Sequence, residues 1–360
     1  RRGLRVAWLA LATGVLTYLP FLLSGYGRLE LVGRDLPVSM MSAGLTGIAW
    51  YAFVVLHFAA SRGRQRTLPL RALDGAALSL LLAALAVTAV PLVMAAGLET
   101  AWRDGLIDVF LESFGEGWFA IALLGLAYAQ LAGRETHPLP PGGAIWQHLG
   151  VILLTAGLAA RSLARLVVTT GAAWAQLPAF LAATVASAGL LLLVVPLLRL
   201  VIRTRAAPNR TLWLLPLLFL LLKALADPLL SAPALAHLMA GGTRILLLHA
   251  FLLGSVSLGL IALVAERLGR DYTPGANAFA LAVLALLAGL TPLTPFWPTA
   301  WSGSWALPVA AWTSLGPPAA ALFMLLAGAL GAPLASGDSF PFRAVLPADT
   351  PQRDGHPSDG

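Results

Sequence analysis

Long runs of apolar residues, separated by short polar connections, dominate the hydrophobic pattern of this chain. A helix needs about 20 apolar residues to cross a hydrocarbon core of about 30 Å. The runs are continuously apolar rather than alternating, which favours helices over strands. Ten runs are long enough and predict ten transmembrane helices, at residues 4–24, 38–60, 73–97, 107–131, 145–169, 175–202, 211–231, 243–265, 275–296 and 307–331.

Composition supports the same fold class. The chain is 59% hydrophobic and 11% charged, with a mean hydropathy of +0.83, whereas soluble domains carry about 25% charged residues. We therefore expect an all-α, polytopic integral membrane protein with a helical bundle over residues 1–331. Residues 332–360 are rich in Pro, Asp, Ser and Gly, a composition typical of a largely disordered tail.

The distribution of arginine predicts how the bundle is oriented. Basic residues cluster at alternate connections, so that sixteen arginines fall on one side of ten spans and six on the other. This bias places both termini in the cytoplasm of a bacterial inner-membrane protein. The net charge of +7 is therefore explained by the orientation of the protein in the membrane and does not indicate nucleic-acid binding. The expected partners are the lipid bilayer and other membrane subunits.

A lysine and an aspartate lie where lipid surrounds the helix. Lys223 is the single lysine of the chain and falls near the middle of the seventh span, with Asp227 one turn later on the same face. Pro228 follows and weakens the local backbone hydrogen bonding. Charged groups at this depth are costly unless they are paired or hydrated. The pair is either a self-neutralising contact that holds helices together or part of a proton relay.

Two further turn-spaced pairs occur in neighbouring spans. Glu112 and Glu116 lie toward the outer end of the fourth span, and Arg161 and Arg165 lie in the outer half of the fifth. The two pairs can meet across the interface between these spans as a ladder of ion pairs. Alternatively the arginines, together with Arg244, can bind a haem propionate or a lipid phosphate.

Histidines offer a possible cofactor site. His57 and His148 lie near the cytoplasmic side, and His237 and His249 lie near the outer side. Imidazole in a helical bundle is either a hydrogen-bonded packing residue or a ligand of haem or copper. A haem with two histidine ligands needs two imidazoles at one depth on facing helices, and both pairs meet the depth requirement. Haem b is the expected cofactor, with copper second.

The segment 248–275, which begins Leu-His-Ala and continues through a small-residue helix to a basic turn, resembles the late transmembrane motif of the NnrS family. That resemblance implies a bacterial membrane protein of the nitric oxide response that carries haem and copper, with His249 as a metal or haem ligand. The chain departs from the family in three ways. It has ten predicted spans rather than about twelve, no histidine in 39–44, and Asp271 where the family has a histidine.

Three functions follow as hypotheses. The first is respiratory or nitrogen-oxide electron transfer with a bound haem. The second is a non-catalytic subunit of a larger membrane complex. The third is a secondary transporter in which Lys223 and Asp227 couple substrate movement to protons. No nucleotide-binding loop or HExxH motif occurs, and there is no cysteine, so the sequence assigns no enzymatic reaction.

Overall fold

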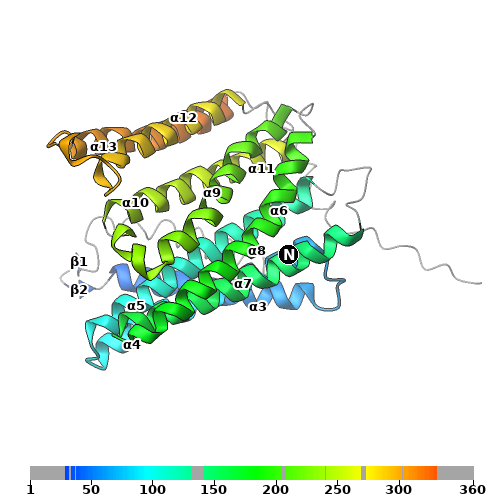
Figure 1. Cartoon of the computed structure of the whole chain (residues 1–360). Coiled ribbons are helices and arrows are strands. Elements are labelled where there is room, and N and C mark those ends of the chain that lie inside the picture. Colours follow the sequence, from blue (N-terminus) through cyan, green and yellow to red (C-terminus); the bar gives the residue numbers. More distant parts are fainter. Residues whose placement is uncertain are drawn as a thin grey trace, which may run out of the picture.

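A computed structural model describes the chain as a stack of long helices (Figure 1). Within the described residues, the remaining regular structure is a short antiparallel hairpin, in which Leu29–Leu31 (β1) pairs with Arg34–Leu36 (β2). The structure describes residues 29–31, 34–36, 38–131, 141–203, 208–239, 241–268, 273–301 and 303–330.

Within these residues, eight helices are long and apolar enough to cross a membrane. They correspond to the third through tenth predicted spans, and the second span is the 24-residue helix Val38–Ser61 (α3). The all-α, multi-pass membrane class is thus confirmed. The first span, 4–24, and the tail, 332–360, lie outside the described residues. The other helices of the first six spans are α4 (Leu68–Ala95), α5 (Thr100–Leu111), η1 (Glu112–Ala120), α6 (Ile121–Leu131), α7 (Pro141–Thr169), η3 (Ala173–Ala175) and α8 (Gln176–Arg203).

The last four spans contain more breaks than the sequence predicts. The connection between the seventh and eighth spans forms a 3₁₀ helix, and the tenth span divides in two at Leu315, just before two prolines. The elements are η4 (Pro208–Trp213), α9 (Leu214–Ser231), η5 (Pro233–Met239), α10 (Gly242–His249), η6 (Ala250–Ser257), α11 (Leu258–Leu268), α12 (Thr273–Leu290), η7 (Thr291–Leu293), η8 (Thr299–Trp301), α13 (Ala306–Ser314) and α14 (Gly316–Leu330).

The helices pack in an order that largely follows the chain. Helix α4 contacts α3, the fourth span and α7; α7 packs on α8, α8 on α9, and α9 on η6. Helices α12 and α14 form the opposite edge of the stack, along the top of Figure 1. The largest apolar core of the described residues is shared by the third to eighth spans and includes Ile121, Leu154, Leu193 and Leu220.

Helices α7 and α8 approach each other unusually closely because glycine lies at their contact. A Cβ atom on Gly189 would come within 2.4 Å of the Leu154 nitrogen and 2.7 Å of the Gly150 oxygen. A Cβ atom on Gly157 would come within 2.5 Å of the Ala186 nitrogen. Small residues allow this backbone contact, which supplies van der Waals packing where lipid provides no hydrophobic driving force between helices.

Two of the spanning helices change winding midway. The fourth span is a continuous helix, Thr100–Leu131, whose central part η1 is π-helical. The eighth span has the same arrangement, with π-helical η6 between α10 and α11. The two π-helical segments contact each other. Because a π turn contains an extra residue, it rotates the side chains that follow relative to an α-helix, and such turns are frequent at functional sites.

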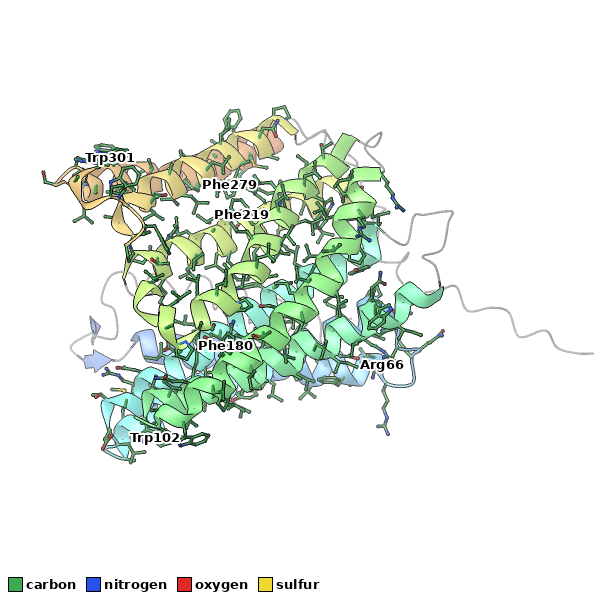
Figure 2. The ribbon with its side chains drawn as sticks, in the orientation of Figure 1. Arg66, Trp102, Phe180, Phe219, Phe279 and Trp301 are labelled. Carbon is green, nitrogen blue, oxygen red and sulfur yellow. The ribbon has the colours of Figure 1, made fainter. Side chains whose placement is uncertain are left out.

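The two ends of the stack differ in their side chains. Arg66 lies at one end, and Trp102 and Trp301 lie at the other (Figure 2). This separation agrees with the predicted arginine-rich cytoplasmic side, and the indole rings at the other end suit the headgroup level of a membrane.

The absence of cysteine makes this orientation directly testable. We expect the single-cysteine variants Arg64→Cys and Arg203→Cys, in intact cells, to resist a membrane-impermeant maleimide until the membrane is permeabilised. We expect Trp174→Cys, at the opposite end of α7 and α8, to react without permeabilisation. Opposite accessibility of Arg64→Cys and Arg203→Cys would contradict the assigned topology.

Candidate functional site

A cluster of six charged side chains joins three spans in the interior of the bundle. Arg161 of α7 is at its centre, with 3% of its side chain exposed. Its Nε donates to Glu112 Oε2 at 3.3 Å and its Nη1 donates to Asp227 Oδ2 at 3.2 Å, while its Nη2 donates to Glu116 Oε2. One guanidinium therefore bonds three carboxylates that come from the fourth and seventh spans.

Lys223 closes the cluster on the α9 side. Its ammonium nitrogen lies 2.8 Å from Asp227 Oδ2 and 3.0 Å from Asp227 Oδ1, and 2.9 Å from Glu116 Oε1. The ring of Phe251, in η6, lies 5.4 Å from the same nitrogen, in the range of a cation–π contact. Lys223 thus links its own helix to both π-helical segments.

Arg165 extends the cluster by one turn of α7. It donates to Glu112 Oε1 through Nη1 and to Ser231 Oγ at 3.5 Å through Nη2. Glu112 accepts a further bond from Ser162 Oγ at 3.1 Å. The Arg165 side chain is 35% exposed, whereas Glu112 is 9% exposed, so the cluster becomes more accessible along α7 from Arg161 to Arg165.

Three carboxylates and three cationic groups give this cluster, hereafter the charge cluster (Glu112, Glu116, Arg161, Arg165, Lys223 and Asp227), a formal net charge of zero. Burial of ions costs several kcal/mol each unless partners and hydrogen bonds compensate. Each member has at least one partner of opposite sign, so the cluster meets this condition. The arrangement is stable only when every member keeps its charge or loses it together with a partner.

Local backbone geometry contributes to the position of these groups. Glu112 and Glu116 both lie in the π-helical segment η1, so their relative directions follow π rather than α winding. On α9, Pro228 lies inside the helix directly after Asp227. Proline has no amide hydrogen, so the Ala224 carbonyl loses its usual helical donor within the turn that carries Lys223 and Asp227.

A small cavity adjoins the charge cluster. It has room for about one water molecule. Its polar wall is made by Glu116, Lys223, Asp227 and Ser187. The rest of the wall is apolar and consists of Ala120, Leu154, Leu158, Ala186 and Leu190. The closely packed pair α7 and α8 therefore provides one side of the cavity, and α9 and the fourth span provide the other.

Most charged residues predicted from the sequence come together here, but Arg244 does not. Arg244 pairs with Asp108 at the exposed end of α10 and α5, outside the charge cluster. Arg161 and Arg165 bond protein carboxylates, the first of the two arrangements that the sequence left open. Sequence reasoning missed Ser162, Ser187 and Phe251, because a buried serine or phenylalanine in a spanning helix normally serves packing.

Among the described histidine side chains, His57, His148 and His249, none bonds a member of the charge cluster. His57 Nε2 lies 2.9 Å from Asp74 Oδ1, and Asp74 also pairs with Arg66 at 3.0 Å. His148 Nδ1 is buried and has no hydrogen-bond partner within the described part of the chain. His249 Nδ1 lies 2.8 Å from the Ile245 carbonyl of its own helix. The side chain of His237, in η5, lies outside the described residues.

A metal site is not apparent among the described residues, which contain no group of three or more His, Cys, Asp or Glu side chains suited to one ion. No protein-family model matches the chain, and no curated protein sequence matches it. The proposed relation to the NnrS family and the binding of haem or copper therefore stay predictions from segment 248–275 and from the histidines.

We expect Arg161 to be the most sensitive member of the charge cluster. Arg161→Met removes one cation from three carboxylates and should destabilise the protein by about 3–5 kcal/mol, lowering the apparent Tm in detergent by on the order of 10 °C. The double variant Arg161→Met/Glu116→Gln leaves Arg165 with Glu112 and Lys223 with Asp227, and should recover part of the loss.

Arg103→Ala serves as the control, because Arg103 forms an exposed pair with Asp104, and exposed pairs contribute about 0–1 kcal/mol. A thermal unfolding curve for Arg161→Met that coincides with that of Arg103→Ala would contradict the central role of Arg161.

Proposed function

We propose that this protein is a proton-coupled secondary transporter and that the charge cluster is its coupling site. The observation that carries the proposal is the bonding of Glu116 and Asp227, on two different spans, to the same two cations, Lys223 and Arg161. Ionisable groups inside a membrane commonly mark ion or proton pathways. The adjoining cavity supplies space for about one water molecule beside these groups.

The coupling follows from the charge balance. Addition of one proton to Glu116 or Asp227 removes a negative charge, leaves a surplus cation in a medium of low dielectric constant, and weakens the contact between α9 and the fourth span. Loss of a proton from Lys223 creates the opposite surplus. Each protonation state therefore favours a different packing of the same helices, and a substrate that binds one packing better shifts the balance between them.

Helix irregularities near the charge cluster allow such a change in packing. Pro228 interrupts the hydrogen bonding of α9, and both η1 and η6 are π-helical. Interruptions of this kind are known sites of bending in spanning helices. By contrast, α7 and α8 are in direct backbone contact at Gly157 and Gly189.

Electron transfer with a bound haem is the second proposal, and the specific observation behind it is the buried, unpartnered Nδ1 of His148. The imidazole of His57 already has a partner in Asp74. A third proposal, a non-catalytic subunit of a membrane complex, rests on exposed apolar residues of α13 and α14 such as Trp312 and Leu325. Lipid and a partner subunit would cover these residues equally well.

Transport predicts proton movement that depends on substrate. In inverted vesicles from a bacterial inner membrane containing the protein, we expect one member of a panel of amino acids, sugars, organic acids and inorganic salts to collapse an imposed pH gradient. Asp227→Asn should abolish the response, because it removes a proton-accepting group.

Asp104→Asn is the matched control, since Asp104 is 58% exposed and pairs with its neighbour Arg103. It should transport like the unaltered protein. A response that Asp227→Asn leaves intact, or no response to any member of the panel, would refute the assignment.

The haem proposal predicts an absorption spectrum. Protein purified in detergent from a haem-replete host should show a Soret band that shifts in His148→Ala or His249→Ala. Stoichiometric haem that both variants leave unchanged would exclude these ligands, and colourless protein that contains no iron or copper would exclude electron transfer.

A further inference from the structure

The start of α4 carries a surplus of positive charge. Residues 62–74 contain four arginines and one carboxylate, Asp74, so four positive charges stand against one negative charge. Asp74 is already bonded by Arg66 and His57. Arg71, in the first turn of α4, is exposed, and its side chain bonds no residue that the structure describes. An anion from outside the chain can therefore bind Arg71 without displacing a protein partner.

Arg71 lies beside the contact of α4 with α7. Gly75 follows it by one turn, and a Cβ atom on Gly75 would come within 2.4 Å of the Thr155 hydroxyl oxygen of α7. Thr155 in turn lies two turns after His148, on the same face of α7. Arg71 and His148 therefore approach one contact from two helices, and the guanidinium interacts electrostatically with the imidazole.

His148 provides a hydrogen-bond donor at this contact. Its Nδ1 is buried and has no partner within the described part of the chain, and no described residue bonds its Nε2. A neutral imidazole has one N–H group and one lone pair. A proton on Nε2 leaves only the lone pair at the buried nitrogen and gives an acceptor from outside the chain an N–H group to bind.

Exposed apolar side chains continue from these two polar groups along the helices. Leu78 lies two turns after Arg71 on α4 and is 49% exposed, and Ile152 lies one turn after His148 on α7 and is 55% exposed. Leu85, a further two turns along α4, is 53% exposed. The surface thus has a cationic end that can donate hydrogen bonds and an apolar length beyond it, which is the order of chemistry that a phospholipid with an anionic headgroup matches.

We propose that this surface, hereafter the lipid site (Arg71, Leu78, His148 and Ile152), binds one anionic phospholipid. The lipid phosphate accepts hydrogen bonds from Arg71 and His148, and an acyl chain lies along Leu78 and Ile152. A guanidinium matches the geometry of two phosphate oxygens, and basic pockets between spanning helices on the cytoplasmic side are typical headgroup sites. The inference goes beyond the proposed functions and does not rest on any of them.

The headgroup charge gives the lipid site its selectivity. Phosphatidylglycerol carries a net negative charge, whereas the ammonium of phosphatidylethanolamine neutralises its own phosphate and competes with Arg71 for it. Inorganic phosphate has the same acceptor oxygens but no acyl chain to cover Leu78 and Ile152. Binding therefore requires the negative charge and the acyl chain together.

The test uses the full chain purified in detergent and titrated with each of these three compounds. We expect native mass spectrometry to show one retained phosphatidylglycerol, and the apparent Tm to rise as the site fills, because a ligand of the folded state stabilises it. The half-saturating concentration of phosphatidylethanolamine should be about tenfold higher, the equivalent of one charge-assisted hydrogen bond. Inorganic phosphate at the same concentration should leave the Tm unchanged.

Substitutions assign the binding to the lipid site. Arg71→Ala should raise the half-saturating concentration of phosphatidylglycerol about tenfold, and His148→Phe, which keeps a ring and removes the donor, should raise it about fivefold. Arg203→Ala is the matched control, because Arg203 is also an exposed arginine of the arginine-rich connections and forms no ion pair with any described residue. It should bind phosphatidylglycerol like the unaltered protein.

The unfolding curves without added lipid show whether each variant is folded. Arg71→Ala should unfold at the temperature of the unaltered protein, since its side chain is exposed, and it decides the test alone if His148→Phe is unstable. Equal binding of the two phospholipids would overturn the lipid site. The same conclusion would follow from phosphatidylglycerol binding that Arg71→Ala leaves intact, or from stabilisation by inorganic phosphate alone.

Discussion

Charge neutrality inside a hydrocarbon solvent is the constraint on which the centre of this protein depends. The guanidinium of Arg161 bonds Glu112, Glu116 and Asp227, and each of these carboxylates has a second cationic or hydroxyl partner. Removing one partner leaves an uncompensated ion, whereas removing a matched pair does not. The fourth, fifth and seventh spans are thus held at one relative position by a set of mutually dependent contacts.

The fold was predictable because each segment that crosses the lipid must be a long run of apolar residues, which the sequence shows directly. The length of the apolar runs alone predicted the eight long helices and α3, because a continuously apolar segment in lipid satisfies its backbone hydrogen bonds by forming a helix. The pairing of Lys223 with Asp227 was also predictable, because the two lie one turn apart on a single helix. Glu112 and Arg161 were predicted to lie at a similar depth in the membrane on neighbouring spans, and this was sufficient to suggest that they meet.

Depth in the membrane did not predict that the pair of Lys223 and Asp227 joins the glutamates and arginines of the fourth and fifth spans in one cluster. The contacts of Lys223 with Glu116 and of Arg161 with Asp227 depend on the rotation of α9 about its axis, and hydropathy contains no information on rotation. Glu112 and Glu116 also lie in a π-helical segment, whose winding departs from the 3.6-residue period assumed for a helix. Ser187 occurs among alanine and glycine, where a hydroxyl resembles ordinary close packing, and its significance depends on a cavity formed by four spans.

The backbone contact between α7 and α8 has a mechanical consequence. At Gly189 and Gly157 the backbones of α7 and α8 meet closely, so any larger residue at either position would force the two helices apart. The opposite side of the cavity is held largely by polar bonds from α9 and the fourth span. The cavity therefore has one side where two backbones are in contact, in α7 and α8, and another where charged side chains join α9, with Pro228 inside it, to the π-helical part of the fourth span.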